Sequence, residues 1–375
     1  MSSRNSKKYT SFREEKLEKG EPVMRYEGSA SGRKAGMAAA GGIDQGRMVF
    51  LREGRERFEL QDLLKSSAEV LGTGNFGCTY RATFPNGPSV VVKRFRDMNR
   101  SGREDFEEHM RRLGRLSHPN LLPLLAYYYR KEEKLLVHDY VPNRSLALLL
   151  HGNRGPNRTT MLDWPVRLKI VKGVASALAY LYEELPMLGV PHGHLRSSNV
   201  LLDDSLEPLL TDYALIPVMN QSHAAKFMVA YKSPERKQIG RTSKKSDVWS
   251  LGMLILEILT SKIPMHDTQQ GKESADLVNW VNSVAREEWA TQVLDGMMGG
   301  RTKNAEGQML KLLQIALACC EENAEKRWEL KEAVEKIQET TQGDGDNSPT
   351  ATASEEEVDS SKAGPEDDLS SIEIN

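Results

Sequence analysis

The pattern of apolar and polar positions changes after the turn at Pro142–Ser145. Before that turn, short apolar runs bounded by turn residues predict strands. The expected strands are Glu69–Leu71, Val90–Phe95 and Leu135–Val141. Helical spacing of apolar residues appears in the same part of the chain at Phe58–Leu64 and Arg103–Leu116. The first part of the sequence therefore predicts a small, β-rich body that includes at least one amphipathic helix.

From Asp163 onward, apolar residues recur with the helical period instead. The expected helices are Trp164–Tyr182, Ser246–Leu259, Ala275–Glu288, Met309–Cys320 and Trp328–Gln338. Strands followed by a longer run of helices indicate an α+β protein with a small β-rich N-terminal lobe and a larger helical C-terminal lobe.

Both ends of the chain have compositions that can bury little apolar surface. Residues 1–56 are polar and dotted with glycine, which favours a flexible leader, and residues 341–375 predict a disordered acidic tail. The formal net charge of −2 hides this asymmetry, because residues 343–375 hold ten Asp and Glu against one Lys. The ordered domain is therefore expected over 57–340.

Composition excludes several classes of protein. The sequence contains no run of Lys and Arg interleaved with aromatic residues, so no nucleic acid partner is expected. Three cysteines cannot form a disulfide framework; we expect an exposed Cys78 and a Cys319-Cys320 pair packed in a helix core. The low cysteine count favours a reducing cytosol. No apolar segment follows Met1, and the apolar stretch Leu251–Leu259 is too short to span a bilayer, so no membrane-crossing segment is expected.

The glycines Gly72, Gly74 and Gly77 have the G-x-G-x-x-G spacing that often marks a phosphate-binding loop. The spacing alone is weak because it also opens dinucleotide-binding folds, where a helix follows the glycines. Here the next residues, Cys78–Ala82, are strand-like and lead to a turn at 85–88. The loop is therefore predicted to be a hairpin flap that can cover phosphates.

Lys93 follows Gly77 by sixteen residues on an apolar strand, where an ammonium group is costly without a polar partner. Taken alone it could be an edge-strand lysine, but Asn199 and Asp212 follow it in order. With these residues and the segment Leu162–Ile170, which reads Leu-Asp-Trp-Pro-Val-Arg-Leu-Lys-Ile, the chain resembles the kinase domain of plant leucine-rich-repeat receptor-like kinases, and especially the pollen receptor-like kinases.

The resemblance runs from about Phe58 to Ile337 and implies a bilobal protein kinase fold that binds ATP and Mg²⁺. It implies nucleotide contacts from Gly72, Gly74, Gly77, Lys93, Asn199 and Asp212, with Asn199 and Asp212 as the metal ligands. It also implies that Arg196 presents positive charge to a phosphate, and that Glu235 and Arg327 form an ion pair that holds the larger lobe.

The departures from the family pattern gather at the catalytic machinery. His194 stands where the family has the aspartate that orients the attacking hydroxyl, and Gly193 stands where it has an arginine. His109 takes the place of the helix glutamate that pairs with the strand lysine, although an exposed histidine in an inactive-like posture is an equal reading. Ala214 replaces the glycine of the Asp-Phe-Gly motif, and Val91 replaces the alanine beside the adenine and narrows the pocket.

These departures favour a pseudokinase, in which the fold is retained and catalysis is lost, acting as a signalling scaffold or allosteric partner of active receptor-like kinases or other signalling proteins. The retained residues leave binding of ATP and Mg²⁺ possible, and the departures also allow that binding to be weak or absent. The alternative is a weakly active Ser/Thr kinase that transfers phosphate by positioning alone, using Lys93, Arg196, Asn199 and Asp212. The resemblance implies a location at the cytoplasmic face of the plasma membrane, with contact to the membrane only peripherally or through a longer receptor chain.

Overall fold

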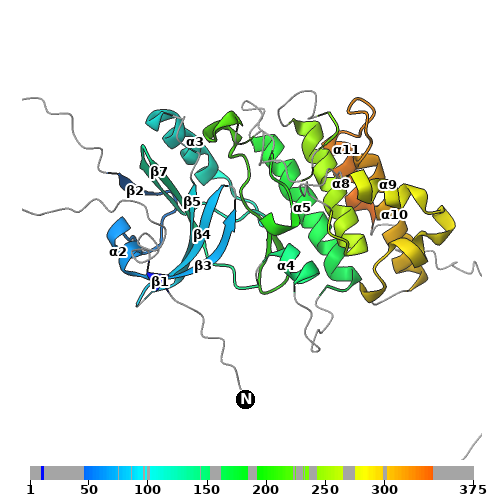
Figure 1. Cartoon of the computed structure of the whole chain (residues 1–375), viewed down its shortest axis with the longest axis horizontal. Coiled ribbons are helices and arrows are strands. Elements are labelled where there is room, and N and C mark those ends of the chain that lie inside the picture. Colours follow the sequence, from blue (N-terminus) through cyan, green and yellow to red (C-terminus); the bar gives the residue numbers. More distant parts are fainter. Residues whose placement is uncertain are drawn as a thin grey trace, which may run out of the picture. The chain divides into compact units, whose positions relative to one another are not determined.

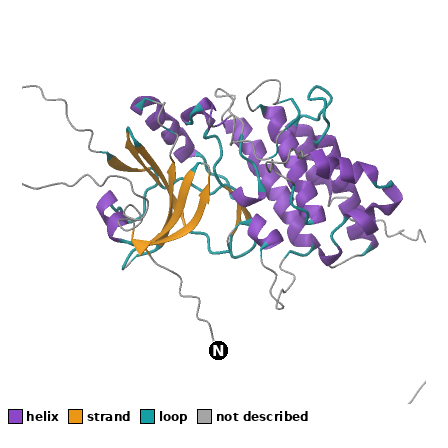
Figure 2. Cartoon of the chain, in the orientation of Figure 1, coloured by secondary structure: helices purple, strands orange, loops and turns teal. Residues whose placement is uncertain are grey.

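The structure is a computed structural model, and it describes most of the chain between residues 46 and 340. The described residues are 10–11, 46–74, 76–85, 87–95, 98, 102–143, 145–152, 162–184, 192–222, 224, 231, 233–235, 243–264, 275–298 and 302–340. Figure 2 shows the strands gathered in one part of this unit and most of the helices in the other. The expected α+β arrangement of a β-rich lobe and a helical lobe is confirmed.

The N-terminal lobe is built on an antiparallel sheet with strand order β1-β3-β4-β5-β7-β6-β2. Its strands are β1 (Thr10–Ser11), β2 (Arg47–Phe50), β3 (Ser67–Gly74), β4 (Gly77–Thr83), β5 (Ser89–Phe95), β6 (Ala126–Arg130) and β7 (Glu133–Asp139). Two helices accompany the sheet, α2 (Leu60–Lys65) and α3 (Arg103–Arg115) (Figure 1). Helix α3 buries Phe106, Met110 and Leu113, the three residues that its apolar spacing placed on one face.

The start of this lobe corrects one expectation. Residues 1–56 were expected to be a leader, yet Arg47–Phe50 forms the edge strand β2 and pairs with Tyr127–Tyr129 and Ala126 of β6. Met48 and Phe50 pack against one hydrophobic cluster of the lobe, and Val49 packs against the other. Four residues were too few to give an apolar pattern that predicts a strand. The acidic tail, 341–375, and most of the leader lie outside the described residues.

The C-terminal lobe is dominated by helices that pack around α8 (Figure 1). Its elements are α4 (Leu146–His151), α5 (Trp164–Glu184), the hairpin β8 (Val200–Leu202) with β9 (Pro208–Leu210), α8 (Lys244–Thr260), α9 (Ala275–Ser283), α10 (Lys303–Cys319) and α11 (Leu330–Gln338). Helix α8 is buried from Ser246 to Thr260, which explains its nearly continuous apolar sequence. The expected helix 275–288 instead ends at Ser283, and a short 3₁₀ turn covers Arg286–Glu288.

Buried polar contacts tie the helices of this lobe together. Arg327, 1% exposed, donates to both carboxylate oxygens of Glu235 at 2.8 and 3.0 Å, which confirms the expected ion pair. Arg167 of the Leu162–Ile170 segment is equally buried and binds Asp295 at 2.7 Å and the carbonyl of Leu162 at 2.8 Å. That segment therefore anchors the start of α5, a role that the sequence pattern did not reveal.

One expectation about the cysteines is correct and the other is wrong. Cys319 and Cys320 are buried at the end of α10, and burial raises the pKa of the Cys319 thiol to about 12. Cys78 was expected to be exposed, but only 6% of it is accessible, because it lies on the inward face of β4. Within the described ranges, none of the helices combines the length and the apolar character that a membrane span requires.

Candidate functional site

A cavity of about 730 Å³ lies between the two lobes and collects the residues singled out from the sequence. Its lining includes all of the candidate nucleotide, metal and catalytic residues, namely Gly72, Gly74, Gly77, Lys93, His194, Arg196, Asn199 and Asp212. Its volume falls in the range of about 300–1,000 Å³ that is usual for small-molecule sites. Residues up to 140 positions apart in the sequence therefore line the same cavity.

The glycine segment forms the roof of this cavity as a hairpin of β3 and β4, as predicted. Gly77 begins β4 with a φ of +142°, and a Cβ at this position would lie 1.8 Å from the carbonyl oxygen of Arg94. Only glycine allows the flap to approach β5 this closely. Val91 of β5 also lines the cavity, as expected for the residue beside an adenine ring.

Lys93 pairs with a carboxylate of the opposite lobe. Its Nζ lies 2.6 Å from Oδ1 of Asp212, and the two side chains are only 13% and 18% exposed. Burial alone would raise the pKa of Asp212, but the charge and the hydrogen bond of Lys93 outweigh burial and leave that pKa below its usual value. Asp212 is therefore held as an anion, and Lys93 has its counter-ion without a helix glutamate.

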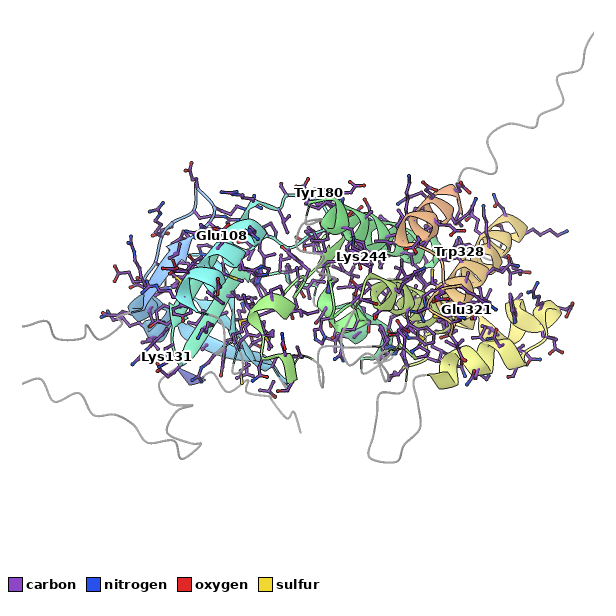
Figure 3. The ribbon with its side chains drawn as sticks, turned by 90° about the horizontal axis from the view of Figure 1, so that it is seen from above. Glu108, Lys131, Tyr180, Lys244, Glu321 and Trp328 are labelled. Atoms are coloured by element: carbon purple, nitrogen blue, oxygen red, sulfur yellow. The ribbon has the colours of Figure 1, made fainter. Side chains whose placement is uncertain are left out.

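His109 points from α3 toward the Asp212 segment and is buried, so the exposed-histidine reading is wrong. Its Nε2 lies 2.7 Å from the carbonyl oxygen of Ala214, a distance at which a neutral imidazole donates its N–H. Burial lowers the pKa of His109, which favours that neutral form. The neighbouring Glu107 and Glu108 pair with Arg103 and Arg112 instead, and Figure 3 shows Glu108 on the outer side of α3.

The backbone at His192 and Gly193 is held by a carboxylate near the start of α8. Asp247 of α8 accepts hydrogen bonds from the backbone N–H groups of His192 and Gly193 and, at 2.8 Å, from the hydroxyl of Tyr182. Burial raises the pKa of Asp247 to about 6 in spite of these donors. Gly193 has a φ of +72°, a left-handed conformation that glycine adopts at little cost.

His194 occupies the position of the missing aspartate and is 6% exposed. Its carbonyl accepts a hydrogen bond of 2.8 Å from Nδ2 of Asn199, which keeps the loop folded around the cavity. The ring of Phe76, at the tip of the flap, meets the His194 imidazole edge to face with 4.9 Å between centroids. An aromatic contact between two lining residues thus joins the flap to the opposite wall of the cavity.

The segment Asp212–Ala214 has an unusual backbone. Asp212 and Ala214 have φ values of +57° and +54°, which residues other than glycine rarely adopt. The hydroxyl of Tyr213 donates to the carbonyl of Leu122 at 2.9 Å, and this bond anchors the segment beneath the sheet. The alanine therefore sits in a conformation for which the family's glycine is better suited.

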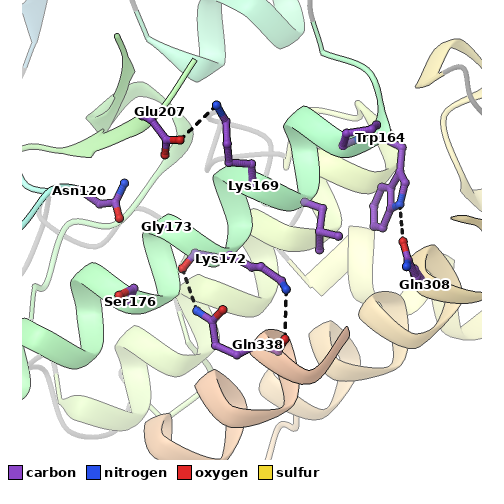
Figure 4. A pocket seen from close by; sticks show the side chains of 11 residues that line it. Asn120, Trp164, Lys169, Lys172, Gly173, Ser176, Glu207, Gln308 and Gln338 are labelled. Carbon is purple, nitrogen blue, oxygen red and sulfur yellow. Dashed lines mark hydrogen bonds and ion pairs between the residues drawn. The ribbon is translucent and has the colours of Figure 1, made fainter. Parts of the chain in front are cut away.

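A second hollow lies on the helical lobe and does not share these features (Figure 4). Its lysines are engaged by neighbours, Lys169 with Glu207 at 3.2 Å and Lys172 with the carbonyl of Gln338 at 3.0 Å. Its Trp164 indole donates to Gln308 at 3.0 Å. The groups of this hollow hold α5 against α10, α11 and the β8–β9 hairpin, and we do not assign it a ligand.

Fold and site together define a protein kinase-like domain. Residues 66–337 match the family described as protein tyrosine and serine/threonine kinase, and the chain belongs to this family.

Relatives with known names are plant receptor-like kinases. The chain is 59% identical over 303 residues to a probable leucine-rich-repeat receptor-like serine/threonine-protein kinase of Arabidopsis thaliana, covering 80% of this chain and 44% of that protein. It is 55% identical over 317 residues to pollen receptor-like kinase 1 of the same plant, covering 84% and 47%. The chain thus spans about half the length of the curated relatives it matches.

Two solved structures show the same fold. The kinase domain of maize sucrose-induced receptor kinase 1 bound to AMP-PNP matches with a TM-score of 0.67 and 28% identity, over 78% of this chain and 99% of that one. The pseudokinase domain of BIR2, an immune regulator of the RLK/Pelle family, matches with a TM-score of 0.65 and 26% identity, over 81% and 93%. The bilobal kinase fold is therefore established for this chain.

Proposed function

We propose that this chain is a catalytically inactive receptor-like kinase domain that acts as a signalling scaffold or allosteric partner of active receptor kinases at the cytoplasmic face of the plasma membrane. The observation that carries the proposal is the buried imidazole of His194 at the catalytic base position. Loss of a general base lowers a rate by about 10²–10⁴.

Neighbouring carboxylates do not take over the role of the base. Asp212 is paired with Lys93, and Asp247 is directed at the backbone of His192 and Gly193. The contacts that hold the fold remain, including the pair of Glu235 and Arg327. A protein-binding role requires the scaffold, which is retained, and does not require the chemistry.

Nucleotide binding is compatible with this role. Lys93, Asn199 and Asp212 line one cavity beneath the glycine flap, and Asn199 and Asp212 are the candidate ligands for Mg²⁺. ATP, when bound, would supply a polyphosphate for Lys93 and Arg196 to contact. Such binding would fix the relative positions of the flap and the catalytic loop and so shape the surface that a partner recognises.

The test of lost catalysis is a phosphate-transfer assay with the purified chain, ATP, Mg²⁺ and casein as acceptor. Intact-protein mass should show no phosphate on the chain or on casein. Phosphate that appears with the unmodified chain and disappears with Asp212→Ala would overturn the proposal. The scaffold role predicts in addition that the chain co-purifies with a pollen receptor-like kinase when both are expressed in plant cells.

A weakly active Ser/Thr kinase is the second candidate, favoured by the presence of Lys93, Arg196, Asn199 and Asp212 around one cavity. Phosphoryl transfer depends largely on positioning and electrostatics, which these residues could still provide. Lys93→Ala should then abolish the residual transfer, whereas Lys331→Ala, an exposed substitution on α11, should leave it unchanged.

A further inference from the structure

A further cavity lies on the face of the N-terminal sheet that is turned away from the cavity between the lobes. Its volume is about 410 Å³, and its lining includes Val90 and Asp139. The residues that follow these two, Val91 and Tyr140, line the cavity between the lobes instead. Successive side chains of an extended chain point to opposite faces, so β5 and β7 separate the two cavities. We call the further cavity the outer pocket, and it lies beside α2, on the side of the sheet away from the helical lobe (Figure 1).

The wall of the outer pocket is aromatic. Phe50, Phe58 and Phe84 all line it, and each is half-buried. The rings of Phe50 and Phe58 meet edge to face with 5.0 Å between centroids, and those of Phe58 and Phe84 lie 4.9 Å apart. Val90 and Leu125, which are buried, add apolar lining. Partly exposed rings favour an aromatic ligand, because ring pairs attract one another beyond the effect of the area that they bury.

The rim of the outer pocket carries charges of both signs. Its basic side chains are Arg52, Arg55, Arg57 and Lys65, and its acidic ones are Glu56, Asp62 and Asp139. Arg55 pairs with Asp139 at 2.7 Å, so these two charges compensate each other. Asp62 accepts a hydrogen bond of 2.8 Å from the backbone N–H of Glu59 at the start of α2.

The other three cations of the rim have no acidic partner within the part of the chain that the structure describes. Arg57 and Lys65 are exposed and form no ion pair there. Arg52 donates to the carbonyl of Leu116 at 2.6 Å, which leaves its charge without a counter-ion. Even with Glu56 and Asp62 counted against them, the cations are in excess by one. The rim therefore favours an anionic group over a cationic one.

The shape of the outer pocket suits a small molecule better than a protein surface. Its volume lies within the range of about 300–1,000 Å³ that is usual for small-molecule sites. The large apolar residues that are exposed in the described ranges are Leu64, Val70, Leu71, Leu148, Ile263 and Met297, and none of these lines the pocket. The apolar groups are thus recessed behind a charged rim. A stable protein interface instead buries about 800 Å² on each partner around an apolar centre.

We infer that the outer pocket binds a small aromatic acid, whose ring packs against the three phenylalanines and whose anionic group lies at the rim near Arg57 and Lys65. This ligand enters from the opposite face of β5 to the cavity between the lobes, so the two sites are separate.

The test uses naphthalene-2-carboxylate, titrated calorimetrically into the unmodified chain, with the neutral naphthalene-2-carboxamide as its matched control. The acid should bind at one site per chain with a dissociation constant below about 1 mM, as expected of so small a ligand. It should bind about fivefold more tightly than the amide at low salt, and this preference should shrink at high salt. Equal binding of acid and amide, or no saturable binding of the acid, would refute the inference.

Substitutions at the rim separate the charge from the ring. Arg57→Gln with Lys65→Gln should weaken binding of the acid about fivefold and leave binding of the amide unchanged. The matched exposed pair on the helical lobe, Lys311→Gln with Lys331→Gln, should change neither. Unaltered binding of the acid by the rim variant would contradict the assignment.

Removing one ring of the wall should act on both ligands. Phe58→Ala should weaken the acid and the amide alike by about tenfold, because it removes the ring that touches the other two. Thermal melting of each variant checks its folding. The rim variant changes only exposed side chains, so it decides the question if Phe58→Ala does not fold.

Hydrogen exchange of the unmodified chain, saturated with naphthalene-2-carboxylate, locates the site. Protection should appear in β2, α2 and β5, whereas protection confined to Gly72–Gly77 and residues 192–199 would place the ligand between the lobes and overturn the inference. The peptide acetyl-Glu-Glu-Trp-Glu-Glu-amide carries a ring and negative charge on a chain, and it should bind no more tightly than the acid. Binding more than about tenfold tighter would show that the pocket receives a protein segment instead.

Discussion

Four histidines of this chain are buried around the catalytic cavity or behind it: His109, His138, His192 and His194. Burial is the main reason that the pKa of His138 is lowered to about 4 and that of His192 to about 3. Both are therefore neutral in the folded protein near pH 7.

These lowered pKa values predict that the free energy of unfolding decreases as the pH decreases. An unfolded histidine takes up a proton near pH 6.5, whereas folded His138 does so only near pH 4. The unfolded state therefore binds more protons between these values, and the stability that His138 contributes above pH 6.5 is lost as the pH falls toward 4. From pH 7 to pH 5, His138 alone should cost about 2 kcal/mol.

Urea unfolding at pH 7 and at pH 5 measures this loss. His138→Gln replaces the imidazole whose Nδ1 lies 2.9 Å from the carbonyl oxygen of Pro123, and it should show a smaller loss than the unmodified chain because glutamine does not titrate. An equal loss in both proteins would show that His138 is not buried in its neutral form.

At the scale of elements, the pair Glu235–Arg327 joins the segment before α8 to the segment before α11. Arg327→Met should lower the free energy of unfolding by about 3–5 kcal/mol, because it leaves a largely buried carboxylate without its partner. Glu235→Leu with Arg327→Met should recover part of that loss. Recovery is incomplete because Arg327 also donates to the carbonyls of Glu321 and Lys245.

Chemical denaturation of the single and double variants measures the coupling between the two residues. The exposed pair of Lys336 and Glu339 at the end of α11, 2.9 Å apart, is the matched control. Lys336→Met should leave unfolding essentially unchanged. A similar cost for both pairs would mean that burial does not set the energetics of Glu235 and Arg327.

Helices and strands with a strong apolar period were predictable from the sequence, and the groups that buried polar side chains bind were not. Helix α3 and strand β5 followed from apolar spacing, and the resemblance to receptor-like kinases implied a common site for Lys93, Asn199 and Asp212. Strand β2 is too short to give a pattern. The backbone partners of Asp247 and Arg167 were not predictable, because a sequence does not display which backbone groups a side chain will bind.

At the scale of the whole domain, contacts across the cavity link the two lobes. Lys93 reaches Asp212, His109 reaches Ala214, and Phe76 reaches His194. Two of these contacts are polar. The third is an aromatic contact made by a flap whose glycines carry no side chain to brace it.

The aromatic contact should therefore control how fast a nucleotide enters. Edge-to-face pairs contribute about 0.5–1.5 kcal/mol. Phe76→Ala should speed both association and dissociation of a fluorescent ATP analogue by about two- to tenfold, with little change in affinity. Stopped-flow fluorescence measures both rates, and Phe76→Leu, which keeps apolar bulk, should lie between the two. Unchanged rates would show that the flap opens without breaking the contact.

The hydrogen bonds that Asp247 accepts from the backbone of His192 and Gly193 have an evolutionary consequence. Because the loop is shaped by a carboxylate outside it, its path does not depend on which side chain stands at position 194. Codons for histidine and aspartate differ by one base. A single nucleotide change could therefore replace His194 by aspartate in a loop whose backbone is already held in place.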